Sequence, residues 1–375
     1  MHRGTTTEIS LSALSHNLSG VRRLCGNRPV IAVVKADAYG HGAVEVSRRL
    51  LRDGASFLAV AFAEEARELR EASLACPILV LFDPDVREVL AQDGIPVIAD
   101  MRVAEALSRE TGRAGRSVGV HVKVDTGMGR LGLRGDVAAQ VLSLSRLPGI
   151  SVEGVMTHLS DADLSDPVAA GEQIRRFRSL QTALAGAGLK IPCLHMANSA
   201  AVLALPEAHF DAVRPGLLLY GCWPLEEAER ASRGGNASFE PAMTVKARIL
   251  SLRRMPAGSA ISYGGTFKTK RDSLIAVISA GYADGYSRAF SNRAQVIAGG
   301  TRAPVVGRVC MDLTMIDVTG IEGLSEGDEV VLLGRQGEET ISASELSSHA
   351  ATIPYEILTS LGGRARRKLY DDQVP

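Results

Sequence analysis

Short apolar runs rich in β-branched residues recur along the N-terminal part of the chain. They are VIAVV, FLAVAF, PILVLF, IPVIA, VGVHVKV, ISVEGVMTH, IPCLHMA and FDAVRPG. Most are separated by segments such as AVEVSRRLLRDG, AEEARELREA, MRVAEALSRETG and AGEQIRRFRSLQTALAGAG, in which apolar residues repeat with helical spacing. Strands that alternate with helices in this way predict a parallel sheet.

The number of strand–helix units favours one α/β fold over another. Eight units within roughly 200 residues predict a (β/α)8 TIM-type barrel, which is usually about that size. A doubly wound sheet is the rival fold. It is disfavoured because no GxGxxG motif follows the first strand.

After Pro241 the pattern changes to short strands that end in glycine-rich or Asp-Gly turns, which predicts a mainly β domain. We therefore expect a barrel over residues 1–238 and a C-terminal β domain over residues 239–375. The glycine-rich stretch near Gly234 is the expected linker. The later segment SASELSSHAATIPYEILTSLG is predicted to be helical, with a basic tail after it.

Composition narrows the class of protein. The chain has 375 residues, 46% hydrophobic and 22% charged, with a formal net charge of +0. This balance gives no support to a nucleic-acid or anionic-membrane partner. The N-terminus lacks the apolar core of a signal peptide, and the five cysteines are scattered without a CxxC pair. We therefore expect a cytoplasmic protein with reduced thiols and no membrane partner.

Lys35 follows the first predicted strand in AVVKADAYGHG. Barrel active sites form at the C-terminal ends of the strands. A single lysine there is nevertheless more often a side chain that reaches to solvent than a functional group. The charged helix EEARELRE between later strands is interpreted as a solvated face.

Several other strand ends carry polar residues as well. They are Lys123 and Asp125 with Arg130 after the fifth strand, Thr157 and His158 after the sixth, His195, Asn198 and Ser199 after the seventh, and Arg214 with Gly216 at the eighth. Each buried polar group that lacks a partner costs about 1–3 kcal/mol, so packing alone does not explain this many. The set predicts a functional site at the barrel mouth.

The turns HMANSA and RPGLL, after the seventh and eighth strands, suit a phosphate group. A phosphate site with a lysine across the mouth indicates pyridoxal phosphate, held as a Schiff base by a lysine that desolvation helps to discharge. A metal site is disfavoured, because no HxH, HExxH or paired-carboxylate set stands at the strand ends.

Nine motifs, in this order and spacing, resemble the alanine racemase family. They are AVVKADAYGHG, KVDTGMGRLG, THLSDAD, HMANSA, VRPGLLLYG, SYGGTF, AGYADGYSR, GRVCMD and YEILTSLGGR, and together they cover essentially the whole chain. The resemblance implies a pyridoxal phosphate-dependent racemase, an isomerase that interconverts L-alanine and D-alanine and supplies D-alanine for peptidoglycan. It also implies a homodimer with an active site shared between subunits.

The resemblance also implies roles for single residues. Lys35 and Tyr263 would be the two bases that act on a pyridoxal phosphate aldimine. The implied cofactor-binding residues are Lys35, Tyr39, His158, Asn198, Ser199, Arg214, Gly216, Leu217 and Tyr355. Among them, Arg214 would face the pyridine nitrogen, and as a group that stays protonated it should weaken the ring as an electron sink.

Substrate contacts are implied at Arg130 and, from the partner subunit together with Tyr263, at Met311 and Asp312. Lys123 matches a position that is carbamylated in some relatives. The stretch LFDP matches the family pattern less closely.

Three alternatives remain open from the sequence. The first is a racemase of broader specificity, for serine or another amino acid, because one methylene in an apolar pocket is worth only about 1–3 kcal/mol. The second is a pyridoxal phosphate decarboxylase, which Arg214 disfavours because a carboxylate is expected at the pyridine nitrogen of such enzymes. The third is a non-catalytic pyridoxal phosphate carrier, which would have no need for SYGG or a second domain.

Overall fold

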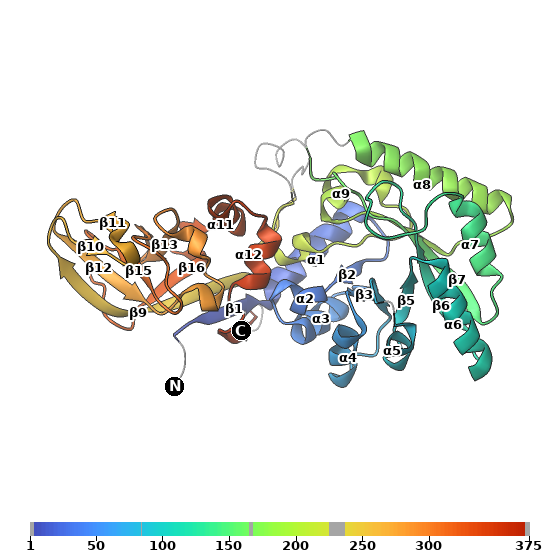
Figure 1. Ribbon diagram of the computed structural model, residues 1–375, viewed down its shortest axis with the longest axis horizontal. Coiled ribbons are helices and arrows are strands. Elements are labelled where there is room, and N and C mark those ends of the chain that lie inside the picture. Colours follow the sequence, from blue (N-terminus) through green and yellow to red (C-terminus); the bar gives the residue numbers. More distant parts are fainter. Residues whose placement is uncertain (1–3, 84, 165–167, 225–236, 372–375) are drawn as a thin grey trace. The chain divides into compact units, whose positions relative to one another are not determined.

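The computed structural model describes residues 4–83, 85–164, 168–224 and 237–371. The chain divides into two compact units (Figure 1). We call Leu14–Ala38 with Gly42–Phe239 the barrel unit, and Met1–Ala13, Tyr39–His41 and Glu240–Pro375 the β unit. The expected linker near Gly234 lies outside the described residues.

The barrel unit is built on seven parallel strands that pair in chain order. They are β2 (Ile31–Val33), β3 (Phe57–Val60), β4 (Ile78–Val80), β5 (Ile95–Ile98), β6 (Val118–Lys123), β7 (Ile150–Met156) and β8 (Cys193–His195). An eighth segment bridges the two edges of this sheet, because Ala212 pairs with His195 and Val213 pairs with Val30. The predicted (β/α)8 architecture is confirmed, and FDAVRPG supplies the eighth segment.

Helices surround this sheet (Figure 1). They are α1 (Leu11–Cys25), α3 (Ala43–Arg52), α4 (Ala63–Glu71), α5 (Val86–Ala91), α6 (Met101–Ala114), α7 (Val137–Ser145), α8 (Val168–Gly186) and α9 (Ser199–Ala204), with the short η1 (Pro206–Ala208) and η2 (Leu217–Tyr220). Helical spacing explains how they pack: in α3, Ala43, Val46, Ser47 and Leu50 are buried on one face. None of the helices in the described ranges combines the length and hydrophobicity needed to cross a membrane.

The β unit contains a nine-stranded sheet with the core order β14-β13-β16-β9-β1-β18, while β12 and β15 pair beside β9 and β17 pairs with β16. Its strands are β1 (Thr6–Ser10), β9 (Met243–Met255), β12 (Ser273–Ile278), β13 (Gln295–Ala298), β14 (Thr301–Pro304), β15 (Thr314–Asp317), β16 (Glu329–Gln336), β17 (Glu339–Ile341) and β18 (Arg366–Tyr370), and β10 (Ala260–Ile261) pairs separately with β11 (Phe267–Lys268). The predicted mainly β character of this part is confirmed.

Short helical segments complete the β unit. They are η3 (Tyr263–Gly265), η4 (Tyr282–Asp284), η5 (Arg288–Phe290), α11 (Ala343–Ala350) and α12 (Pro354–Ser360). Gly299 and Gly300 join β13 to β14 in a two-residue hairpin, and both have positive φ, at 56° and 75°. Glycine adopts this conformation without the steric cost that a Cβ would add.

The N-terminal strand differs from the prediction, which put residues 1–238 in the barrel domain. β1 pairs antiparallel with β9 and parallel with β18, so residues 1–13 belong to the β unit. The basic tail, for which no strand was predicted, forms β18. Both differences have one cause: the hydrogen-bonding partners of these strands lie hundreds of residues away, where local patterns carry no signal.

Candidate active site

The barrel unit brings the predicted polar residues to the C-terminal ends of its strands. Lys35 follows β2 after one intervening residue, Lys123 ends β6 and His195 ends β8. Burial differs among them: Lys123 and Arg214 are only 3% and 5% exposed, whereas Lys35 is half-buried. This is the face on which barrels carry their active sites.

The chain turns sharply after Lys35. Residues 36–39, none of them glycine, all have φ between 52° and 54°, so α2 (Lys35–Tyr39) is a left-handed turn. Non-glycine residues pay roughly 1–2 kcal/mol each for this conformation. Strain of this kind persists only where surrounding contacts hold it, and it concentrates at functional sites.

Two carboxylates hold this turn. Glu65 of α4 accepts hydrogen bonds from the backbone N–H of Ala36 (2.6 Å) and of Ala61 (2.5 Å), which ties the residue after Lys35 to the end of β3. Asp37 accepts from the N–H of Ala43 (2.7 Å) at the start of α3. Glu65 therefore departs from the expectation that the charges of this helix only face solvent.

The two lysines at the mouth are easier to deprotonate than free lysines. The pKa of Lys35 is lowered by burial and by the charge of Arg130, against the opposing effect of Glu65. The pKa of Lys123 is lowered to about 8, by burial and then by Arg130, Arg214 and Lys35, with Asp125 opposing. Both amines therefore have a larger neutral fraction near neutral pH than an exposed lysine.

Arg214 is part of a buried hydrogen-bonded chain. Its Nη1 donates to Nδ1 of His195 (2.8 Å), and its Nη2 donates to the carbonyl oxygens of Thr157 (2.7 Å) and Met196 (3.2 Å). Nε2 of His195 lies 2.8 Å from Nδ1 of His121. Because a guanidinium only donates, Nδ1 of His195 must be an acceptor, so its proton sits on Nε2 and points to His121.

The histidines around Arg214 are neutral. Burial, followed by the charge of Arg214, lowers the pKa of His121 to about 4 and the pKa of His195 well below its usual value. The pKa of His158 falls to about 3, through burial and then Arg214, Arg130 and the two lysines. His158 therefore offers an uncharged ring at the end of β7.

The turns after β8 and the eighth segment meet at one hydroxyl. Ser199 Oγ accepts hydrogen bonds from the backbone N–H of Gly216 (2.9 Å) and of Leu218 (3.3 Å), and Leu217 is buried between them. Asn198 caps α9 by accepting from the N–H of Ala201 (3.0 Å). The Ser199 hydroxyl still has its own proton to donate.

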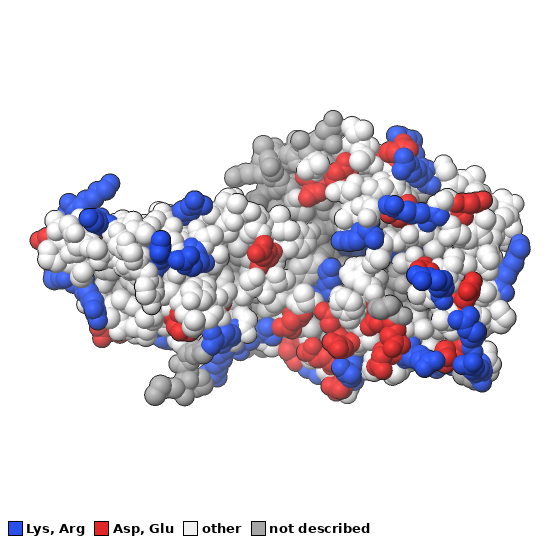
Figure 2. Space-filling model, in the orientation of Figure 1, with Lys and Arg blue, Asp and Glu red and all other residues white. Residues whose placement is uncertain are grey.

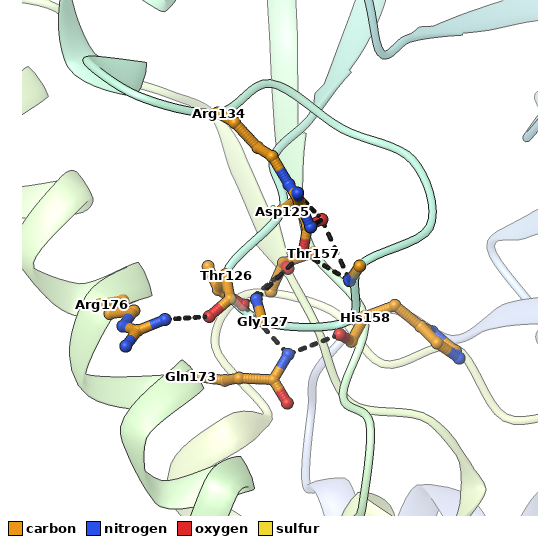
Figure 3. Close-up of polar contacts among 9 residues, drawn as sticks. Asp125, Thr126, Gly127, Arg134, Thr157, His158, Gln173 and Arg176 are labelled. Carbon is orange, nitrogen blue, oxygen red and sulfur yellow. Dashed lines mark hydrogen bonds and ion pairs between the residues drawn. The ribbon is translucent and has the colours of Figure 1, made fainter.

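The loop after β6 carries Arg130. Contacts of Asp125 and Gln173 hold this loop (Figure 3). Asp125 accepts from the N–H of Gly127 (3.0 Å) and Gly129 (3.1 Å) and pairs with Arg134 (2.6 Å). Gln173 of α8 donates to Thr126 Oγ1 (3.2 Å) and to the carbonyl oxygen of His158 (2.8 Å). The loops after β6 and β7 are thereby joined through one buried amide.

The β unit contains the remaining predicted residues. Tyr39 packs against Tyr355, the second residue of α12, with ring centroids 5.7 Å apart. Burial, and then Tyr355, raises the pKa of the Tyr39 phenol, so Tyr39 is a hydrogen-bond donor at neutral pH. The predicted pair of tyrosines is thus together in the structure.

Tyr263 begins η3, and Met311 and Asp312 lie on a neighbouring loop of the β unit. Ser262, next to Tyr263, donates from Oγ to the carbonyl oxygen of Arg308 (2.7 Å), which is three residues before Met311. The side chains of Tyr263 and Met311 are 70% and 54% exposed. Large apolar groups exposed together are typical of a binding surface.

Three residues that are close to these groups were missed from the sequence: Glu65, His121 and Phe82. Glu65 stands at the third position of its helix, where a glutamate can reach back to the preceding backbone, and this was the one signal available. Within the described ranges, no group of three or more histidine, cysteine, aspartate or glutamate side chains is arranged to hold a metal ion.

Comparisons with known proteins support the family resemblance of the sequence. The family model of the alanine racemase N-terminal domain matches residues 9–224, and that of the C-terminal domain matches residues 242–369. An alanine racemase of Thermodesulfovibrio yellowstonii is 50% identical over 372 residues, which is 98% of each chain. One from Desulfosudis oleivorans is 42% identical, over 96% of this chain and 95% of its own length.

Solved structures agree on the fold. The alanine racemase of Bacillus anthracis with bound L-Ala-P superposes with a TM-score of 0.91 at 33% identity, covering 99% of this chain and 96% of its own. The alanine racemase of Bartonella henselae with covalently bound pyridoxal phosphate superposes with a TM-score of 0.87 at 28% identity, covering 98% and 99%. The chain therefore belongs to the alanine racemase family, a family of isomerases.

Proposed function

We propose that this chain interconverts L-alanine and D-alanine, with pyridoxal phosphate held at the barrel mouth by Lys35. The observation that carries this proposal is the cluster at the strand ends. It combines an amine of lowered pKa with the buried Arg214 and with backbone N–H groups directed at Ser199. The family membership supports the same reaction.

The residues fit the cofactor's chemistry at both of its ends. The N–H groups of Gly216 and Leu218 donate to Ser199 Oγ, which leaves the hydroxyl proton of Ser199 as a donor that suits a phosphate oxygen. At Arg214, both Nη atoms are occupied by protein acceptors, and among the described residues Nε has no hydrogen-bond partner. Nε is the donor that we assign to the pyridine nitrogen.

Further contacts complete this assignment. The hydroxyls of Tyr39 and Tyr355 are proposed to bind the phosphate, and His158 and Asn198 to lie beside the cofactor. When bound, pyridoxal phosphate supplies an electron sink for the charge that develops at Cα of the substrate. A charged Arg214 at the pyridine nitrogen, rather than a carboxylate, limits that sink and disfavours decarboxylation.

Two bases on opposite faces of Cα are needed to racemise an amino acid. We assign Nζ of Lys35 to the proton of D-alanine and the phenol oxygen of Tyr263 to the proton of L-alanine. Arg130 would orient the substrate carboxylate. Lys123 is predicted to be carbamylated, and its lowered pKa supports this because carbon dioxide reacts with neutral amines.

Tyr263, Met311 and Asp312 are proposed to come from a second copy of the chain in a homodimer. Their exposure supports this, because a base that is 70% exposed needs a covering surface before it can act in a dry site. The proposed role is the supply of D-alanine for peptidoglycan, which a D-alanine-requiring bacterial strain would report by growth after complementation.

The activity is tested with the purified full-length protein and added pyridoxal phosphate. Chiral chromatography should detect D-alanine formed from L-alanine and the reverse, and in D2O both enantiomers should gain deuterium at Cα. Protein without the cofactor is the control. If neither enantiomer is converted and Cα does not exchange, the proposed reaction is wrong.

The shared site is tested by mixing two inactive variants, Lys35→Ala and Tyr263→Phe. If each site joins Lys35 of one copy to Tyr263 of the other, half of the molecules in a fully exchanged mixture are mixed dimers with one intact site each. About a quarter of the wild-type activity should then return. A mixture that stays inactive after exchange, verified with differently tagged copies, would contradict the shared site.

A further inference from the structure

One aromatic ring lies among the cations of the barrel mouth. The centroid of the Phe82 ring is 4.8 Å from Nζ of Lys123, 5.2 Å from Nζ of Lys35 and 5.8 Å from Cζ of Arg130. All three distances are within the roughly 6 Å over which an aromatic face attracts a cation. The three cations come from three different elements, so the ring connects parts of the mouth that are far apart in the sequence.

The position of Phe82 is fixed by its backbone. It follows β4 by two residues, and its N–H donates to the carbonyl oxygen of Ala61 (3.0 Å). The next residue, Asp83, accepts from the N–H of Ala63 (2.8 Å) at the start of α4. Two hydrogen bonds therefore hold the chain at Phe82 and at the next residue, just beyond the end of β4.

The three cations near the Phe82 ring have few other contacts that could hold their side chains in place. Within the described ranges, the side chains of Lys35, Lys123 and Arg130 form no hydrogen bond and no ion pair. The nearest carboxylates are used elsewhere: Glu65 binds backbone N–H groups and Asp125 pairs with Arg134. These like charges repel one another, since Arg130 and Lys35 both lower the pKa of Lys123, and a group with a negative face among them offsets that repulsion.

We propose that Phe82 is a positioning residue of this active site. Its ring face holds the amine of Lys35 and the guanidinium of Arg130 at the barrel mouth, and it holds the amine of Lys123 in protein that is not carbamylated. The inference rests on the proposed function in taking Lys35 as the reacting amine. The ring contacts themselves are independent of that function.

Removing the π-face has a predictable electrostatic effect. The ring favours the charged form of an amine, so its loss lowers the amine pKa. For Lys123, loss of the ring would add to the lowering of the pKa by burial, Arg130, Arg214 and Lys35, whereas Asp125 raises this pKa. For Lys35, loss of the ring would add to the lowering of the pKa by burial and Arg130, whereas Glu65 raises this pKa. A desolvated cation–π contact corresponds to a shift of about 1 pH unit.

The test compares Phe82→Leu with Phe82→Tyr. Leucine keeps an apolar side chain without a π-face, whereas tyrosine keeps the ring. Full-length protein in bicarbonate-free buffer, with and without added pyridoxal phosphate, is acetylated briefly at a series of pH values. Peptide mass spectrometry then gives the reaction midpoint of Lys123 in both forms and of Lys35 without cofactor. The exposed Lys190 serves as an internal control.

We expect the midpoints of Lys123 and Lys35 to fall by about 1 pH unit in Phe82→Leu and to stay unchanged in Phe82→Tyr. Lys190 should not respond in either variant. In the loaded enzyme, Phe82→Leu should reduce kcat/KM about tenfold, with the acid limb of its pH profile shifted in the same direction, while Phe82→Tyr should remain within about twofold.

Wild-type midpoints in Phe82→Leu would overturn the inference. Equal shifts in both variants would also overturn it, because tyrosine keeps the π-face and should not shift them. If Phe82→Leu does not fold, Phe82→Met, which is also apolar and not aromatic, replaces it. A protein that shows the expected midpoints but no conversion of alanine would refute the proposed function and leave the positioning role of Phe82 intact.

Discussion

The two units present their candidate functional groups in opposite ways. In the barrel unit, Lys123 and Arg214 are 3% and 5% exposed, and burial is the largest cause of their lowered pKa values. In the β unit, Tyr263 and Met311 are 70% and 54% exposed. The barrel unit thus prepares its groups by removing them from water, whereas the β unit offers groups that must be covered by another surface before they act.

The two units differ in their buried charges but not in the charges on their surfaces. On the face shown in Figure 2, both units carry acidic and basic side chains together. The buried charges of the barrel unit are unusual, because burying a charge costs free energy unless the charge is hydrogen-bonded. Four experiments test this comparison between the units, and they follow from the largest expected effect to the smallest.

Tyr263→Phe is expected to have the largest effect. Racemisation should fall by about 10²–10⁴-fold, the usual contribution of a positioned acid–base group, while the free energy of unfolding stays unchanged because the side chain is exposed. Steady-state kinetics and urea denaturation measure the two quantities. Tyr370→Phe, on β18 of the same unit, is the matched control and should keep full activity; equal losses in both variants would contradict the assignment.

Arg214→Met should destabilise the protein more than Arg302→Met. Without Arg214, the buried acceptors on His195, Thr157 and Met196 lose their donor, at a cost of about 3 kcal/mol. Arg302 of the β unit is 29% exposed and pairs with Glu339 and Glu345, where loss costs about 1 kcal/mol. Urea denaturation followed by circular dichroism compares them, and equal losses would remove the distinction between the units.

Acid should destabilise the barrel unit through its neutral histidines. The unfolded chain protonates them below pH 6.5, whereas the folded chain protonates His121 only near pH 4 and His158 near pH 3. The unfolded state therefore binds more protons between these values, and the free energy of unfolding falls as the pH is lowered from 6.5, by about 1.4 kcal/mol per pH unit for each histidine.

Trp223, the single tryptophan, lies in the barrel unit against Phe239, so its fluorescence during urea denaturation at several pH values reports this effect. His121→Gln should reduce the slope of the free energy of unfolding against pH by the contribution of one histidine. An unchanged slope in that variant would show that His121 is not neutral in the folded protein.

The smallest effects are expected at two glycines, with opposite signs. Gly300→Ala in the β13–β14 hairpin should destabilise by about 1 kcal/mol, because φ is +75° although no atom lies within 4 Å of the added Cβ. Gly112→Ala in α6 of the barrel unit meets equally open space at a helical φ and should stabilise by about 0.5–1 kcal/mol. Thermal unfolding measures both, and equal signs would contradict the role of φ.

Much of the barrel was predictable because its signals are local. Apolar runs and helical spacing determine each strand and helix, and Lys35, Lys123 and Arg214 could be recognised because polar residues at the ends of buried strands are out of place. The two-residue Gly299–Gly300 hairpin was indicated in the same way by glycines that a turn requires.

The sequence by itself thus determined the alternating strands and helices of the barrel, the mainly β character of the second part and the identity of most candidate residues. Only the tertiary structure decided that β1 joins the β unit, that Glu65 holds the turn after Lys35 and that Phe82 lies among three cations. The reason is physical: periodicity reports which face of an element is buried. Hydrogen bonds, charge and burial depend instead on neighbours that folding brings together from distant parts of the chain.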